Sequence, residues 1–206
     1  MKDFAARFGT PLETVRPRGG RVIEGFSAKL QRRIRLFSHS HFAQWIRLEA
    51  DPSVIAFCER PARVGPQPDA LLVDFWVDGP HGQTMLLLDS QRPGAVPAVP
   101  SQLDGIPVRT VAAAELAAAA VWISNWSRML PVVNATRSLL PTPLLRSVLD
   151  HVQEPISLAR LEHELSFGDP SLARGAIFEQ LRLGRICAPS LHTQPLGLHT
   201  QLEPLS

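Results

Sequence analysis

The segment LLVDFWVDGPHGQTMLLLDSQRP, residues 71–93, predicts the centre of the fold. Two apolar runs flank the residues Asp78 to Gly82, which are typical of a turn, so the segment predicts an antiparallel hairpin. Each predicted strand carries one carboxylate among apolar neighbours, Asp74 and Asp89. A buried carboxylate needs a cationic partner, and two that meet at the end of a hairpin can hold Mg²⁺ for phosphodiester hydrolysis. The alternative is that both are ordinary strand-end or turn residues.

Composition predicts a folded chain with one large or two small domains. The chain has 206 residues, of which 45% are hydrophobic and 19% charged, so it can bury a core and global disorder is excluded. Its formal net charge is only +2, yet residues 1–47 hold ten basic residues against three acidic ones. Such an excess predicts contact with a polyanion, and a solvated basic arm without a ligand is the alternative.

The cysteines and the apolar runs predict a soluble, cytoplasmic protein. Cys58 and Cys187 are far apart, and neither has a second cysteine at metal-ligand spacing, which is typical of a reduced intracellular protein. The N-terminus lacks the apolar stretch of a signal peptide. The longest apolar run, residues 111–123, is too short to cross a bilayer and contains Glu115, so no membrane partner is expected.

The first half of the chain predicts a sheet with one helix across it. Residues 1–20 are rich in Pro, Gly and Arg and favour an arm on the surface, and residues 33–37 alternate as in a half-buried strand. A helix capped by Ser38 or Ser40 is expected to end at Asp51-Pro52. A strand within residues 54–64 would pair with the hairpin.

The second half predicts a loop, a strand and then mainly helices. Prolines and glycines after Pro93 indicate a loop, residues 107–111 a strand, and the alanine-rich residues 112–129 a helix that covers the sheet. Three helices, 144–153, 158–165 and 170–183, and an alternating tail then suggest a winged helix. Its third helix would present Arg174, Glu179, Gln180 and Arg182, a near-neutral surface that favours a protein partner over DNA. A helical cap without a partner is the alternative.

Several segments together resemble the N-terminal domain of TnsA-type transposon endonucleases, in an order and spacing that match over most of residues 16–93. These segments are Gly25-Phe26-Ser27-Ala28-Lys29, Arg33, Ser38-His39-Ser40-His41, Asp51 to Pro61, Val73-Asp74-Phe75 and Asp89-Ser90-Gln91. The stretch from Asp51 to Pro61 is the most specific of them. The predicted winged helix agrees with the second domain of that family.

The resemblance implies an α/β fold, a restriction-endonuclease-like mixed sheet with flanking helices, followed by a small winged-helix domain. We therefore predict a basic arm over residues 1–20, a nuclease-like domain over 21–135 and a winged-helix domain over 139–206. Members of the family nick DNA at the 5′ ends of a mobile element. The implied partners are transposon-end DNA, an integrase-type transposase and an AAA+ ATPase regulator, the last bound through the winged-helix domain.

The same resemblance implies a degenerate active site formed by His41, Asp74, Asp89 and Gln91. In the family an Mg²⁺ or Mn²⁺ ion is held by acidic residues, and here Asp74 and Asp89 match two of the metal ligands. His41 stands where the family has a helix glutamate, and Gln91 where it has a lysine. Histidine offers Mg²⁺ no anionic oxygen, and glutamine carries no charge toward the attacked phosphate. Each lost electrostatic contributor lowers the rate by roughly 10²–10³-fold.

Three functions follow from these departures. The favoured one is a catalytically weak or inactive subunit that binds transposon-end DNA and its protein partners. The second is an active but atypical endonuclease, and the third is a winged-helix DNA-binding regulator with a structural N-terminal sheet. In the first two, DNA contact is expected through the basic residues of the N-terminal region, which are Arg18, Lys29, Arg32, Arg33 and Arg35.

Overall fold

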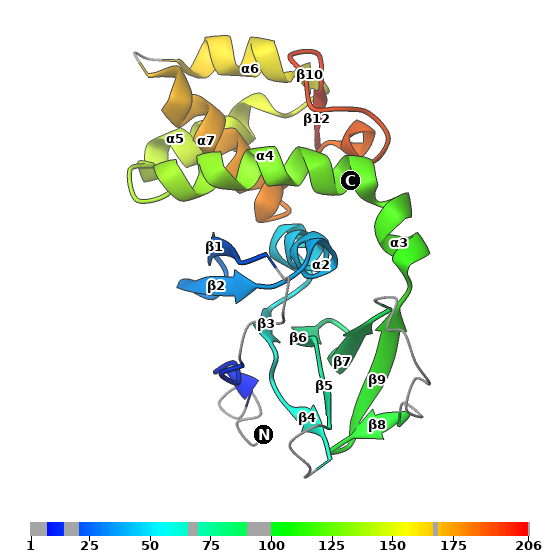
Figure 1. Cartoon of the computed structure of the whole chain (residues 1–206). Coiled ribbons are helices and arrows are strands. Elements are labelled where there is room, and N and C mark those ends of the chain that lie inside the picture. The colour runs from blue at the N-terminus through cyan, green and yellow to red at the C-terminus, as the bar shows by residue number, and fades with distance from the viewer. Residues whose placement is uncertain (1–7, 15–20, 66–69, 90–99, 167–168, 206) are drawn as a thin grey trace. The chain divides into compact units, whose positions relative to one another are not determined.

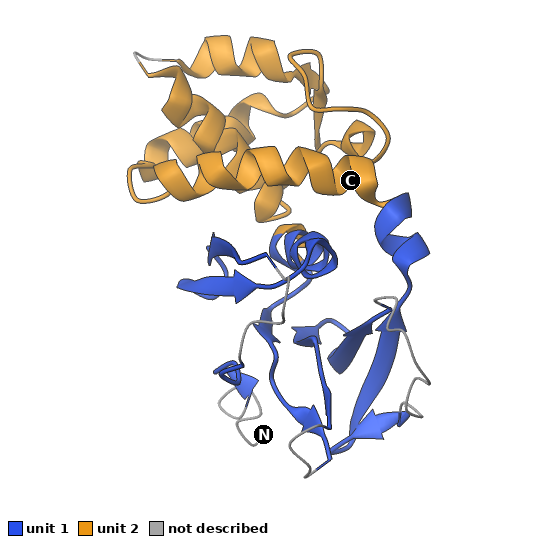
Figure 2. Cartoon of the chain, in the orientation of Figure 1, with its two compact units in different colours: residues 1–49, 53–118 blue, residues 50–52, 119–206 orange. Residues whose placement is uncertain are grey.

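The computed structural model of the chain, which describes residues 8–14, 21–65, 70–89, 100–166 and 169–205, is an α/β structure (Figure 1). It divides into two compact units. Unit 1 comprises residues 1–49 and 53–118, and unit 2 comprises residues 50–52 and 119–206 (Figure 2). Among the described residues, no helix is long and apolar enough to cross a membrane.

Unit 1 contains a mixed five-stranded sheet in the order β3-β6-β7-β9-β8. Its strands are β3 (Ala56–Glu59), β6 (Phe75–Gly79), β7 (Gly82–Leu88), β8 (Gln102–Leu103) and β9 (Ile106–Val111). β6 and β7 pair antiparallel, so the hairpin predicted within residues 71–93 is confirmed. β9 runs parallel to β7, while the other pairs are antiparallel. The sheet is therefore mixed, as predicted.

One face of this sheet buries an apolar cluster that includes Cys58, Trp76 and Met85. These three side chains come from β3, β6 and β7, and each is at most 1% exposed. The cross-strand register places Trp76 opposite both Cys58 and Met85, so the three lie side by side on the same face. Phe8 covers the cluster, with its ring centroid 5.8 Å from that of Trp76. The described part of the N-terminal arm thus contributes to the core of unit 1.

A native-state thiol titration should find one accessible cysteine. Cys58 is fully buried, and burial raises the pKa of its thiol to about 12, so it should not react near pH 8 until the protein unfolds. Cys187 is partly exposed and should react. Ellman's reagent is expected to modify about one thiol in native protein and both in denaturant. Cys187→Ser should remove the native reaction and Cys58→Ala should leave it, and a fast native reaction in Cys187→Ser would contradict the assignment.

A hairpin and one helix pack together beside the sheet. β1 (Ile23–Ser27) pairs antiparallel with β2 (Arg32–Leu36), and α2 (His39–Ala50) follows. β2 alternates as predicted, with Ile34 and Leu36 buried and Arg33 and Arg35 exposed. On β1, a Cβ atom at Gly25 would lie 2.6 Å from the indole of Trp45 in α2. Only glycine allows this close approach, because any side chain there would displace the indole.

The strand predicted within residues 54–64 is split in two. β3 pairs with β6, and after a break β4 (Arg63–Val64) pairs with β5 (Leu71–Leu72). The break holds Arg60, whose φ of 50° lies in the left-handed region. Opposite it, the backbone N–H of Arg60 donates to the carbonyl of Asp74, in the gap between β5 and β6. The two breaks therefore face each other and interrupt the predicted hairpin at Asp74.

The helix predicted over residues 112–129 is two helices, α3 (Ala113–Ala118) and α4 (Ala120–Thr136). α3 belongs to unit 1 and α4 to unit 2, so the predicted single helix spans the division between the units. The buried face of α4 runs through Trp126, Met129, Leu130 and Val133, large apolar side chains whose burial stabilises the helix in unit 2. The units consequently divide at residue 118, whereas the predicted domain boundary lies between residues 135 and 139.

Unit 2 places α4 beside three further helices, a 3₁₀ turn and a small sheet. These elements are α5 (Thr142–His151), β10 (Ile156–Ser157), α6 (Leu158–Leu165), α7 (Pro170–Arg182), β11 (Ile186–Cys187), η1 (Pro189–His192) and β12 (Gln201–Pro204). The sheet order is β10-β12-β11, with antiparallel pairs. The tail predicted as a two-stranded wing thus supplies two strands of a three-stranded sheet, separated by η1.

The surface predicted for the third helix, α7, is wrong in detail. Gln180 is 0% exposed and donates to the carbonyl of Leu145 in α5. Arg182 pairs with Glu179, and Arg174 forms a bidentate pair with Glu162. Many residues of α7 are buried, because the helix packs against α4, α5 and α6. Its polar side chains are therefore largely used within unit 2.

Candidate functional site

Asp74 is a buried carboxylate at the break between β5 and β6, and it is only 4% exposed. Its backbone N–H donates to the carbonyl of Leu86. Its side-chain Oδ2 accepts from the backbone N–H of Leu88 at 2.6 Å. The break therefore turns the carboxylate toward the end of β7 and supplies one of the hydrogen bonds that a buried charge requires.

His41 supplies the second partner of Asp74. His41 lies in the first turn of α2, and its Nε2 is 2.8 Å from Oδ1 of Asp74. Its Nδ1 is 2.5 Å from Oγ of Ser38, which also caps the helix by accepting from the backbone N–H of His41 at 3.2 Å. Because a carboxylate only accepts hydrogen bonds, Nε2 carries the hydrogen. Both ring nitrogens of His41 are thus hydrogen-bonded, one to Ser38 and one to Asp74. The imidazole is therefore the partner of the carboxylate that the sequence analysis assigned to a metal ion.

Of the other two predicted site residues, the structure describes only Asp89. Asp89 directly follows β7 and is exposed, with its backbone N–H donating to the carbonyl of Val111 in β9. Gln91 lies outside the described residues. Within the described ranges, no group of three or more His, Cys, Asp and Glu residues converges to hold a metal ion. Mg²⁺ takes oxygen ligands, so one carboxylate facing an imidazole nitrogen does not by itself fit it.

Some of the predicted DNA-binding side chains are engaged in hydrogen bonds or ion pairs within the protein, and others are exposed. Lys29 donates from Nζ to the carbonyls of Leu48 and Val54, at 2.8 and 2.9 Å, and so satisfies the C-terminal end of α2. Arg32 is bound to Glu59, as described below. Arg33 and Arg35 are exposed on β2, and Arg18 lies outside the described residues.

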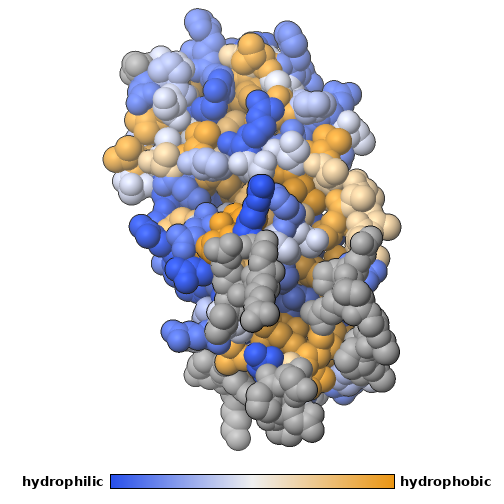
Figure 3. Space-filling model, viewed as in Figure 1, coloured by the Kyte–Doolittle hydropathy of each residue, from blue (hydrophilic) through white to orange (hydrophobic). Residues whose placement is uncertain are grey.

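The exposed arginines lie on a polar surface. Arg35 pairs at 3.0 Å with exposed Glu24, which faces it across the hairpin, while Arg33 faces Phe26. On the side shown in Figure 3, hydrophilic residues gather over the part of unit 1 that holds β1 and β2. Of the predicted basic residues that the structure describes, Arg33 and Arg35 are therefore the exposed ones.

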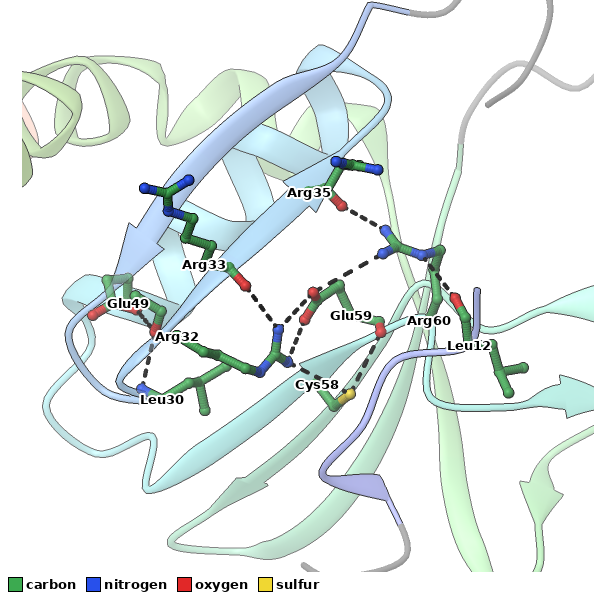
Figure 4. Close-up of polar contacts among 10 residues, drawn as sticks. Leu12, Leu30, Arg32, Arg33, Arg35, Glu49, Cys58, Glu59 and Arg60 are labelled. Atoms are coloured by element: carbon green, nitrogen blue, oxygen red, sulfur yellow. Dashed lines mark hydrogen bonds and ion pairs between the residues drawn. The ribbon is translucent and has the colours of Figure 1, made fainter. Parts of the chain in front are cut away.

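A buried cluster of opposite charges lies beneath β2. Glu59, at the end of β3, is 1% exposed, and its two carboxylate oxygens accept from both Nη atoms of Arg32 at 2.8 and 2.6 Å. Figure 4 shows the two side chains pointing toward each other, with Arg60 beside them. The hydrogen bond to Glu59 raises the pKa of Arg32, and burial lowers that of Arg60. Glu59 is thus the centre of the cluster.

Glu59 and Arg60 were not singled out as functional residues in the sequence. The signal that could have found them is a charged pair directly after the apolar residues Ala56 to Cys58, since charges at the end of a buried strand need partners. The partner Arg32 is distant in sequence, however, and only the fold brings it to Glu59.

No known protein family matches the chain, and no curated protein matches it either.

Proposed function

We propose that this protein is a TnsA-like subunit of a transposition machinery that acts at transposon-end DNA and whose nuclease site is degenerate. The mixed sheet with its β6–β7 hairpin, and a helix that brings residue 41 to Asp74, support an endonuclease-like scaffold. The single observation that carries the proposal is the contact between His41 and Asp74.

This contact supports loss of catalysis because a histidine stands where the family has a glutamate that binds the metal ion. The histidine instead hydrogen-bonds to the aspartate that would be the other ligand. An endonuclease of this type needs the strand aspartate to offer an oxygen to a divalent cation. Here Oδ1 of Asp74 faces the imidazole and Oδ2 accepts from Leu88, so a cation would share each oxygen with a hydrogen-bond donor and be held less strongly. An active, atypical nuclease remains the second candidate, because Asp74 sits at a hairpin end as such chemistry requires.

Unit 2 is proposed to be a winged-helix domain that binds the protein partners, an integrase-type transposase and an AAA+ regulator. The element order α5-β10-α6-α7-β11-β12, with β12 between β10 and β11, supports that reading. Because the polar side chains of α7 are engaged within the unit, we favour protein over DNA as its ligand.

Binding to transposon-end DNA should depend on salt through the exposed arginines of β2. Each phosphate neutralised in duplex DNA contributes about 0.9 to the slope of log affinity against log salt. The double variant Arg33→Ala/Arg35→Ala should therefore lower that slope by about two units in a fluorescence-anisotropy titration. Arg109→Ala removes another exposed arginine, paired with Glu115, and serves as the matched control. An unchanged slope in the double variant would reject β2 as the DNA contact.

A further inference from the structure

Unit 1 contains a cavity beside the buried charge cluster. Its volume is about 480 Å³, and it lies between residues 11–14, strand β2 and the pair Glu59 and Arg60. Small-molecule sites commonly have volumes of roughly 300–1,000 Å³. Four arginines contribute to its lining, which are Arg32, Arg33, Arg35 and Arg60. The cavity is therefore large enough for a small anion and is rich in groups that bind one.

The arginines around Glu59 outnumber its carboxylate. The single carboxylate of Glu59 faces two guanidinium groups, Arg32 at 2.6 Å and Arg60 at 4.0 Å. Cys58 does not supply a second negative charge, because its raised pKa of about 12 keeps the thiol neutral. Arg32, whose side chain is 27% exposed, holds Glu59 closely, so the buried Arg60 shares its one carboxylate with Arg32. Among the described residues no second carboxylate pairs with Arg60.

The remaining acids of the cavity lie at its exposed edge. Glu24 is occupied by Arg35, and Glu13 is exposed. Neither forms an ion pair with Arg60 within the described part of the chain. Solvent screens exposed carboxylates, so they offset a buried guanidinium only weakly.

The side chain of Arg60 is fixed in place. Its Nη1 donates to the carbonyl of Arg35 at 2.6 Å, its Nε donates to that of Leu12 at 3.4 Å, and its guanidinium lies 5.1 Å from the ring centroid of Phe37. Figure 4 shows the side chain extended between Arg35 and Leu12. Among the described residues, the partner of its second Nη group is Glu59, at 4.0 Å. Left-handed backbone at a buried arginine is strained, and such strain concentrates at functional sites.

We propose that this cavity binds a phosphate group, with Arg60 as the buried cation and Arg33 at the edge as the second contact. A guanidinium offers parallel N–H donors that match phosphate oxygens, and a bound phosphate supplies a second negative charge beside Arg60. The phosphate comes either from a DNA terminus or from a free phosphorylated molecule. The inference stands without the proposed function, since inorganic phosphate is itself the probe.

Calorimetric titration of the full chain with sodium phosphate tests this site, with sodium chloride of equal ionic strength as the control. We expect saturable binding by the unmodified protein, at least tenfold weaker in Arg60→Gln and weaker in Arg33→Ala. Arg109→Ala lies outside the cavity and should bind as the unmodified protein does. Phosphate should also raise the thermal midpoint of the unmodified protein and not that of Arg60→Gln. Because Arg33 is exposed, its variant reports on binding even if Arg60→Gln is poorly folded.

Two oligonucleotides that differ only in a 5′-phosphate identify the source. Tighter, Arg60-dependent binding of the phosphorylated oligonucleotide assigns the site to a DNA terminus. Equal binding of both, together with Arg60-dependent binding of inorganic phosphate, assigns it to a free phosphorylated molecule. Absence of saturable phosphate binding, or equal phosphate binding by the unmodified protein, Arg60→Gln and Arg33→Ala, overturns the proposal.

Discussion

Changing His41→Glu together with Gln91→Lys should raise Mg²⁺-dependent nicking of DNA by about 10⁴-fold or more, since each restored electrostatic group contributes roughly 10²–10³-fold. A glutamate at residue 41 would begin from the same turn of α2 and face Asp74 with oxygen instead of nitrogen. Two facing carboxylates repel each other unless a cation lies between them, so the change favours Mg²⁺. The lysine would supply the charge beside the attacked phosphate. Conversion of a supercoiled plasmid, and of transposon-end DNA with the partner proteins present, measures the gain.

The unmodified protein and Asp74→Asn decide between the two nuclease hypotheses. Asp74→Asn in the double variant should abolish the regained activity. If the unmodified protein already nicks DNA and Asp74→Asn removes that activity, the degenerate site is refuted and the atypical nuclease stands. If the double variant binds Mg²⁺ by calorimetry yet remains inert, residues 41 and 91 do not hold the roles that the resemblance implies.

Replacing Glu59 with alanine should lower the free energy of unfolding by about 3–5 kcal/mol, the usual cost of leaving a buried charge without its partner. The change would leave Arg32 and Arg60 facing each other with no carboxylate between them. Chemical denaturation, monitored by tryptophan fluorescence, measures this loss. Phosphate should restore part of it, because an anion in the adjacent cavity would replace some of the missing charge.

Glu24→Ala provides the matched control for this prediction. It also removes a glutamate that pairs with an arginine of β2, but both partners are more than half exposed. Exposed pairs contribute about 0–1 kcal/mol, so the control should be close to the unmodified protein. Equal, small effects of the two substitutions would show that the buried cluster is not a determinant of the stability of unit 1.

The sequence alone was sufficient for several local elements of unit 1, although not for the breaks at Arg60 and Asp74. Alternating burial in β2, the turn residues between β6 and β7, and a serine cap before α2 are determined by neighbours in the chain, and each was predicted. The resemblance also selected His41 and Asp74 as members of one site. The hydrogen bond between them joins residues 33 positions apart, and only the folded structure shows that it forms.

Tertiary structure decided the features that depend on which side chains meet. The alanine-rich segment predicted as one helix is two helices, and the second, α4, buries Trp126 and Met129 within unit 2. Helix periodicity identifies an apolar face but not its partner. The sharing of Glu59 between Arg32 and Arg60 likewise needed the fold, because Arg32 is distant in sequence and only the structure shows that Glu59 and Arg60 are buried. Burial is what makes the partners of Glu59 and Arg60 matter, because a charge removed from water needs a partner of opposite charge.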